Sequence, residues 1–380
     1  MNYVRWAILA LLLLQLPGFF LFNIGPSLGS LSSYLTSGLL LVYFFFAQPK
    51  HRLFIPFIVL GILFFTFSTF NFSSEDETEF IKSFLRFMIV VACGNEVVQR
   101  TNNRDLLVVL IVGGLSIIIH GVVFPDAYTE FSTVTGRASG FYLNPNYAGT
   151  VALVGYSLSL ASSSKRLRWT GMLIFSLAGL LTLSRTFIVI WVIINLIASV
   201  RSRKNLLGFA VGGAMVILIL TVSTFLELNT ERFSALESLF SNNVQTETIT
   251  KDTRMDTWAK YTPKVWEAPI FGNGYNKLRG KQYGGSGIHN TYLMVWGESG
   301  ILPFLFLMGL YFYLVLGCLK YFDTNPEYLY VIIVIALAML ASHGYFESFF
   351  MVFISMFVYA RIRDLKKQEL QPPPKATAST

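Results

Sequence analysis

The chain has 380 residues, of which 54% are hydrophobic, 16% aromatic and only 13% charged. Soluble globular proteins carry about 25% charged residues, so this composition excludes a soluble multidomain protein. The net charge of +8 would point to nucleic acid in a soluble protein. Here a charge bias across a membrane explains it, and we expect no nucleic-acid partner. The apolar residues lie in runs of roughly 16 to 22, long enough to cross a bilayer, without the alternation of β-barrel strands.

Hydropathy predicts an all-α polytopic membrane protein with about twelve transmembrane helices. The expected spans, in chain order, are 6–22, 28–47, 53–71, 80–98, 105–124, 145–163, 168–183, 185–200, 205–226, 289–319, 327–344 and 346–361. The first is read as a membrane helix rather than a removed signal peptide, because no A-x-A site follows it. The tenth is too long for one straight crossing. We expect a short helix at the membrane surface and then a span from about Ser299.

Charge predicts the orientation of these spans. If the N-terminus is cytoplasmic, the inner segments hold 17 of the 29 Lys and Arg residues, whereas the outer loop at 75–79 is acidic. Both termini are therefore expected in the cytoplasm. Cys93 and Cys318 fall in apolar runs and are expected to be buried thiols.

The same reading divides the chain into four parts. They are nine spans over 1–226, a large outer loop over 227–288, three spans over 289–361, and a cytoplasmic tail over 362–380 expected to be disordered.

Several basic residues remain for the outer face. Arg185, in LTLSRT, lies at a junction between spans seven and eight with almost no loop, so its charge is held at the membrane surface. Such a charge is costly and usually functional, although snorkelling to lipid headgroups is the alternative. Arg137 lies in GRASGFYLNPNYAG, beside an Asn-Pro-Asn turn (Asn144 to Asn146) that could cap the next helix. Arg254 lies in RMDTW within the large loop.

These three arginines suit an anionic ligand, because a guanidinium is always charged and its rigid fork matches phosphate. A pyrophosphate could engage two or three of them. Lys82 and Arg86, in the outer half of span four, are weaker candidates. For this pair we favour an ion pair with the acidic loop just before them.

His289 is the candidate proton acceptor. It follows a Gly-rich run and opens a helix at the outer boundary. A histidine titrates at about pH 6.5, so it can take a proton at neutral pH. Asn290, Tyr292 and Glu298 follow it and are expected to support it. The alternative is a helix-start histidine that bonds the backbone.

Other candidates carry weaker signals. His343 and Glu347, near the outer end of span eleven, form a pair for which a structural role is favoured, and His120 is expected in the core. The sequence has no DxD, HExxH or CxxC pattern, so neither a metal nor a cofactor is expected. The Gly-rich run is not a Walker motif, because neither Ser nor Thr follows Lys281. We expect the run either to move over a substrate or to act as a plain flexible linker.

Three segments resemble the O-antigen ligase family and the related O-antigen polymerases. They are GRASGFYLNPNYAG, LTLSRT, and the block from RMDTW through PIFGNGYN to HNTYL and GESGIL. The resemblance covers about residues 105–345. It implies a GT-C type glycosyltransferase of the bacterial inner membrane, with its active site and the large loop facing the periplasm.

The resemblance also implies a reaction and its residues. Such enzymes take a glycan from undecaprenyl diphosphate. Ligases pass it to lipid A–core and polymerases pass it to another lipid-linked repeat; we favour a ligase. The family has arginines at the SR and RxxxW positions, here Arg185 and Arg254, a histidine at the HN position, here His289, and an arginine before the Asn-Pro-Asn turn, here Arg137. Pro303 stands where family members often have Gly, a difference that bears on packing.

We therefore expect an inverting, metal-independent glycosyltransferase without cofactors. Arg185 and Arg254, with Arg137, would hold the pyrophosphate, and His289 would act as the base or orient the acceptor. Asn144 and Asn146 would support this site, and membrane lipids are the further partners. The competing class is a twelve-span transporter or lipid flippase. It is disfavoured because the connection between spans six and seven is short and the long loop is outside and off-centre.

Overall fold

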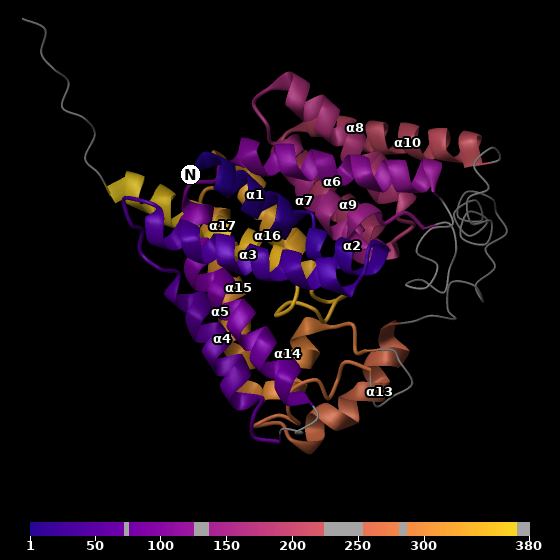
Figure 1. The fold of residues 1–380 in the computed structure, drawn as a ribbon. Coiled ribbons are helices and arrows are strands. Elements are labelled where there is room, and N and C mark those ends of the chain that lie inside the picture. The colour runs from indigo at the N-terminus through magenta and orange to yellow at the C-terminus, as the bar shows by residue number, and fades with distance from the viewer. Residues whose placement is uncertain (72–75, 125–136, 224–253, 281–286, 371–380) are drawn as a thin grey trace, which may run out of the picture.

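A computed structural model describes residues 1–71, 76–124, 137–223, 254–280 and 287–370 (Figure 1). These residues form fifteen α-helices and two short 3-10 helices, with no strand among them. The expectation of an all-α protein is confirmed for the described part of the chain.

The helices follow the predicted apolar segments in chain order. They are α1 (Asn2–Leu13), α2 (Leu16–Asn23), α3 (Pro26–Phe46), α4 (Ile55–Phe67), α5 (Glu77–Gln99), α6 (Asn103–Val123), α7 (Pro145–Leu160), α8 (Lys165–Leu181), α9 (Arg185–Arg201), α10 (Leu207–Ser223), α13 (Arg254–Glu267), α14 (Thr291–Ser299), α15 (Ile301–Lys320), α16 (Pro326–Ala338) and α17 (Phe349–Leu370). Every predicted span contains a helix or a pair of helices. Of the described helices, α13 alone lies within the predicted outer loop, whose residues 227–253 are outside the described part.

Three described helices, α3, α6 and α15, are long and apolar enough to cross a membrane, and the bent pair of α1 and α2 would make a fourth. Helices α4 and α16 are apolar but shorter. The chain is thus a helical membrane protein. The count of about twelve spans and the cytoplasmic location of both termini stay predictions.

The first predicted span is not one helix. Helices α1 and α2 meet at an angle of 62°, and Gln15 between them is in the left-handed region with φ 53°. Pro17 explains the break, because proline has no N–H to donate and its ring clashes with the preceding turn. The residue that causes the bend is therefore Pro17, two positions after Gln15.

The predicted break in the tenth span is present. Helix α14 ends at Ser299 and α15 begins at Ile301. Gly300 between them has φ 83°, and a Cβ at this position would lie 2.0 Å from the carbonyl oxygen of Ile270. Only glycine fits both the backbone conformation and the close approach of the segment that follows α13.

The start of the predicted tail is helical, which corrects the expectation of disorder from residue 362. Helix α17 continues to Leu370, and residues 371–380 lie outside the described part. The extension is rich in Arg, Lys, Leu and Gln, which are good helix formers. Ion pairs between Arg361 and Asp364 and between Lys320 and Glu369 hold it in place.

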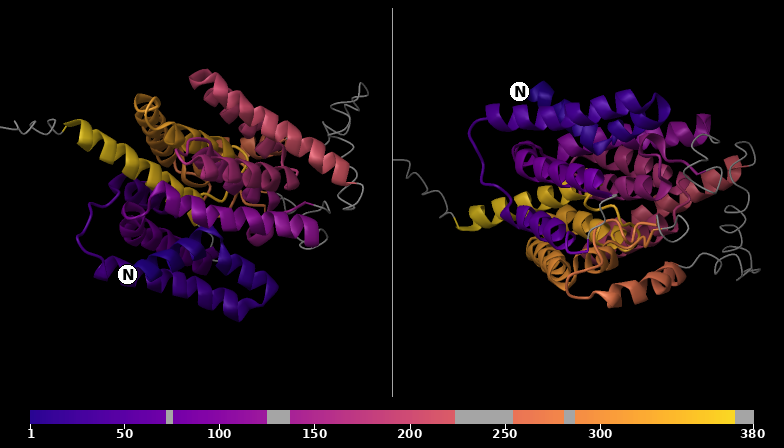
Figure 2. Two further views of the ribbon diagram at one scale, coloured as in Figure 1. Left: turned by 90° about the horizontal axis from the view of Figure 1, so that it is seen from above. Right: turned by 60° about the horizontal axis from the view of Figure 1, so that its bottom comes forward.

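Helix α7 runs through the centre of the molecule. Nearly all of its residues are buried, and it packs against α6, α8, α9 and α16. A helix that is apolar all round is stable only when other helices surround it. Helices α1 to α3 and α10 lie on opposite sides of the left view in Figure 2. The N-terminus and the end of α17 lie at one end of the molecule, and α13 lies at the other (Figures 1 and 2).

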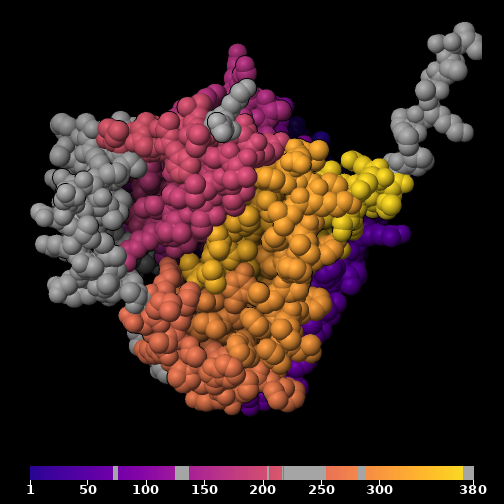
Figure 3. Space-filling model, turned by 180° about the vertical axis from the view of Figure 1, so that it is seen from behind, coloured from indigo at the N-terminus to yellow at the C-terminus, as the bar shows by residue number. Residues whose placement is uncertain are grey.

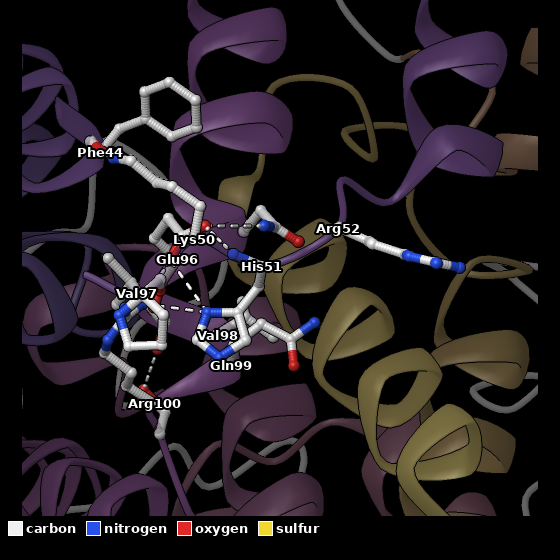
Figure 4. A network of polar contacts seen from close by, with 12 residues as sticks. Phe44, Lys50, His51, Arg52, Glu96, Val97, Val98, Gln99 and Arg100 are labelled. Atoms are coloured by element: carbon white, nitrogen blue, oxygen red, sulfur yellow. Dashed lines mark hydrogen bonds and ion pairs between the residues drawn. The ribbon is translucent and has the colours of Figure 1, made fainter. Parts of the chain in front are cut away.

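A polar network fixes the C-terminal end of α5 (Figure 4). Glu96 is fully buried and forms an ion pair with Arg100. Its carboxylate also accepts a 2.8 Å hydrogen bond from the His51 amide and lies 3.0 Å from His51 Nδ1. Arg100 Nη2 donates to the Pro49 carbonyl at 2.7 Å. A buried carboxylate needs such partners, and these join α5 to the segment between α3 and α4.

Candidate functional site

A cavity of about 270 Å³ lies where the first turns of α7, α9 and α14 meet the turn between α16 and α17. This turn, residues 339–348, is outside both helices. Five of the predicted site residues line the cavity, namely Asn144, Asn146, His289, His343 and Glu347. Gln15, Tyr147, Thr186 and Ser348 are also among its lining residues. The volume is slightly below the usual range for small-molecule sites, about 300–1,000 Å³.

The first turn of α7 forms one wall. The Asn144 side chain accepts hydrogen bonds from the amides of Asn146 (2.9 Å) and Tyr147 (3.2 Å), so the predicted cap is confirmed. Proline follows at the first helical position, where its missing N–H is not needed. The start of α7 is thereby fixed against the cavity.

Arg137 is attached to this wall. Its Nε donates to the Thr182 carbonyl at 3.0 Å, and its Nη2 donates to Asn146 Oδ1 at 3.1 Å. The same Asn146 oxygen accepts a 2.9 Å hydrogen bond from Ser184 Oγ. Arg137 therefore joins the ends of α7, α8 and α9. His120 is in the core as expected, 4% exposed, and its Nδ1 accepts from the Ser139 amide at 2.9 Å.

Arg185 is the first residue of α9 and is exposed. Ser184 caps this helix by accepting from the Phe187 amide at 3.4 Å, and Thr186 lines the cavity. A cation at a helix N-terminus opposes the helix dipole. A residue that goes against such a local preference of helices is typical of functional positions.

Arg254 is the first residue of α13 and reaches the opposite wall. Its Nη1 donates to the Ala341 carbonyl at 2.9 Å, and Ala341 lines the cavity. The three predicted arginines are not themselves among the residues that line the cavity. Each adjoins or bonds to a lining residue: Asn146, Thr186 or Ala341.

The His289 ring lies against the His343 ring, with centroids 4.9 Å apart. Burial, together with the nearby His289, Arg279 and Arg254, lowers the pKa of His343 to about 3. His343 is therefore neutral at physiological pH. His289 itself has φ 47°, an uncommon conformation for a residue other than glycine.

The O-antigen ligase family model matches residues 170–308. This match supports membership of the O-antigen ligase family through the segment from α8 into α15. No curated protein matches it. The family segment runs from α8 into α15 and contains Arg185, Arg254 and His289. The match supports a general class, a membrane glycosyltransferase of the O-antigen ligase and polymerase type.

Three predicted supporting residues within the family segment hold α14 in place and are not among the residues that line this cavity. Asn290 caps α14 by accepting from the Leu293 amide at 3.1 Å. Tyr292 Oη donates to the Ala336 carbonyl at 2.9 Å. Glu298 is fully buried and pairs with Arg279.

Arg279, also in the family segment, is a residue that the sequence analysis missed. Its side chain is 6% exposed and forms ion pairs with both Glu298 and Glu347, and it stacks 4.5 Å above the Tyr275 ring. It therefore joins the loop before α14 to the cavity wall at Glu347. The signal was a basic residue in the Gly-rich run and an acid in the following helix, but sequence spacing gives no reason to pair them.

Arg86 lies apart from the other predicted arginines. It lines a second cavity of about 260 Å³, which shares Gln15, Tyr147, Glu347 and Ser348 with the first. The described residues contain no group of three His, Cys, Asp or Glu side chains placed to hold a metal ion.

Proposed function

We propose that this protein is an inverting, metal-independent glycosyltransferase. It moves a glycan from undecaprenyl diphosphate to an acceptor sugar at the periplasmic face of the bacterial inner membrane. The acceptor we favour is lipid A–core, which makes the protein an O-antigen ligase.

One observation carries the proposal. A cavity that contains His289 is bordered by three elements that bear Arg137, Arg185 and Arg254. Guanidinium groups bind phosphate oxygens through charge-assisted hydrogen bonds, and a histidine beside them can take a proton. This combination suits a diphosphate leaving group and a hydroxyl nucleophile.

The reaction then follows in one displacement. The acceptor hydroxyl attacks the anomeric carbon from the face opposite the diphosphate and forms the new C–O bond. The bond from the anomeric carbon to the phosphate oxygen breaks, and polyprenyl diphosphate leaves with the electron pair. Arg185 and Arg254, with Arg137, stabilise the growing negative charge. His289 accepts the hydroxyl proton, and the configuration at the anomeric carbon inverts.

The test is glycan transfer in nanodiscs by R185A, R254A and H289A, compared at equal protein levels. Loss of a transition-state arginine should cost roughly 10²–10³ in rate. Loss of the base should cost about 10²–10⁴. R166A is the matched control, because Arg166 is an exposed arginine at the start of α8. Near-normal turnover by all three variants would reject the site.

The acceptor is tested with a lipid-linked repeat, with and without lipid A–core. A single capped lipid product that needs core supports a ligase. A ladder of products without core identifies a polymerase instead. Absence of any transfer in nanodiscs, where there is no compartment to cross, would favour a carrier.

A further inference from the structure

The second cavity lies between α1, α2, α3 and α5. Gln15, Tyr147, Glu347 and Ser348 form the wall that it shares with the first cavity. The wall formed by these four side chains therefore separates a ligand in one cavity from a ligand in the other. A two-substrate transfer requires this kind of adjacency.

Arg86 supplies the second cavity with a positive charge. It is partly buried on α5, and within the described ranges it forms neither a hydrogen bond nor an ion pair. The ion pair that we expected between Arg86 and the acidic loop is therefore not formed with Asp76, Glu77 or Glu79. Glu75 lies outside the described part of the chain. A guanidinium in a membrane helix is costly to keep without an anion. The cavity thus provides one site for an anionic group.

Polar groups in the cavity extend the site beyond this charge. Helix α3 places Ser30, Ser33 and Ser37 on one face, at spacings of three and four residues. Ser37 donates its hydroxyl to the Ser33 carbonyl at 3.3 Å, as Ser32 and Thr36 donate theirs to other carbonyls of α3 at 2.9 and 2.7 Å. Within the described residues, the hydroxyls of Ser30 and Ser33 make no such bond. Such hydroxyls suit the hydroxyl groups of a sugar.

Gln15 adds a second, independent observation. Its Oε1 atom is buried and has no hydrogen-bond partner within the described part of the chain. Burying an amide oxygen without a hydrogen bond costs about 1–3 kcal/mol of folding free energy. A ligand that donates a hydrogen bond to this oxygen would recover that cost. The break between α1 and α2 places this side chain in the wall between the two cavities.

We propose that the second cavity binds the phosphorylated sugar head of the glycolipid acceptor, with Arg86 on its phosphate. This inference rests on the proposed function. The hydroxyls of α3 and the Gln15 amide bind the sugar, and Leu11, Leu12 and Leu21 contact the lipid part. The donor belongs to the other cavity, because its diphosphate requires several cations and each of the three arginines adjoins or bonds to a residue that lines that cavity. Glu347 in the shared wall pairs with Arg279, which weakens its repulsion of the phosphate.

The test uses the full chain in nanodiscs and compares R86Q with K82Q. Lys82 is one turn earlier on α5, exposed and not among the lining residues, so it is the matched control. R86Q should raise KM for lipid A–core about tenfold or more, with kcat and the donor KM nearly unchanged. K82Q should leave all three constants unchanged. An equal effect of both variants, or a change confined to the donor KM, would overturn the proposal.

A binding measurement without donor separates this inference from the proposed function. Phosphorylated lipid A–core should bind wild type about tenfold or more tightly than R86Q does. A dephosphorylated sample should bind both proteins equally. Equal binding of phosphatidylglycerol and lipid A–core would identify a plain phospholipid site and overturn the proposal. If wild type transfers no glycan yet this Arg86-dependent binding persists, the proposed function fails and the binding site stands.

Discussion

The buried ion pair between Arg279 and Glu298 gives the sharpest test of how the site is held together. The Glu298 carboxylate accepts from Arg279 Nε at 3.2 Å, from Arg279 Nη2 at 3.1 Å and from the Leu278 amide at 3.2 Å. Its side chain is fully buried and that of Arg279 is 6% exposed. Removing the Glu298 charge leaves Arg279 with only the partly exposed Glu347 as its partner, and breaking a buried pair costs about 3–5 kcal/mol. At ~2 °C per kcal/mol for a large chain, E298Q should lower Tm by roughly 6–10 °C.

Thermal unfolding in detergent, followed by tryptophan fluorescence, measures this shift. The control is E267Q, because Glu267 pairs with Lys264 while its side chain is 57% exposed, and such pairs contribute little. The double variant R279L/E298L should be less destabilised than the sum of the single variants, since no fully buried charge is left unpaired and the remaining Glu347 side chain is 40% exposed. A Tm of E298Q within about 1 °C of wild type would refute the reasoning.

Three further predictions concern the same region. His343 has a folded pKa of about 3, below the unfolded value near 6.5. The unfolded state therefore binds a proton first as pH falls, and stability should drop between pH 6.5 and 3; H343Q should flatten this slope in Tm measured against pH. N144A removes the cap of α7 and should cost about 1 kcal/mol, seen as a small fall in Tm with unchanged helix content by circular dichroism. G300A places a Cβ 2.0 Å from the Ile270 carbonyl oxygen at positive φ, so it should abolish folded protein in size-exclusion chromatography. A monodisperse G300A protein with wild-type Tm would contradict the close packing at this break.

The positions of the helices were predictable, because long apolar runs between charged segments leave few alternatives to membrane helices. The breaks were harder. The one near Ser299 was predicted from excess length, whereas the one at Gln15 depends on a single proline within a run of ordinary length. The helical start of the tail was also missed, because its contacts come from other helices.

The candidate site, like the fold, was predictable only in part. Motifs predicted Arg137, Arg185, Arg254 and His289, and these residues or their neighbours border one cavity. The partners of Glu298 and Glu347 were not predictable, because Arg279 meets both only through folding of the loop before α14. Pairwise contacts between distant segments leave no periodic signal in a single sequence.

The first part of the turn between α16 and α17, residues 339–342, is held to other segments through its main-chain carbonyls. The carbonyl of Met339 accepts from the Thr291 amide at 2.8 Å, that of Ala341 from Arg254, and that of Ser342 from Thr291 Oγ1 at 2.7 Å. A peptide carbonyl is present whatever residue occupies the position. These hydrogen bonds therefore do not depend on the side chains of Ala341 and Ser342, so substitutions at these two cavity-lining positions can retune substrate preference while the backbone that supports the site persists.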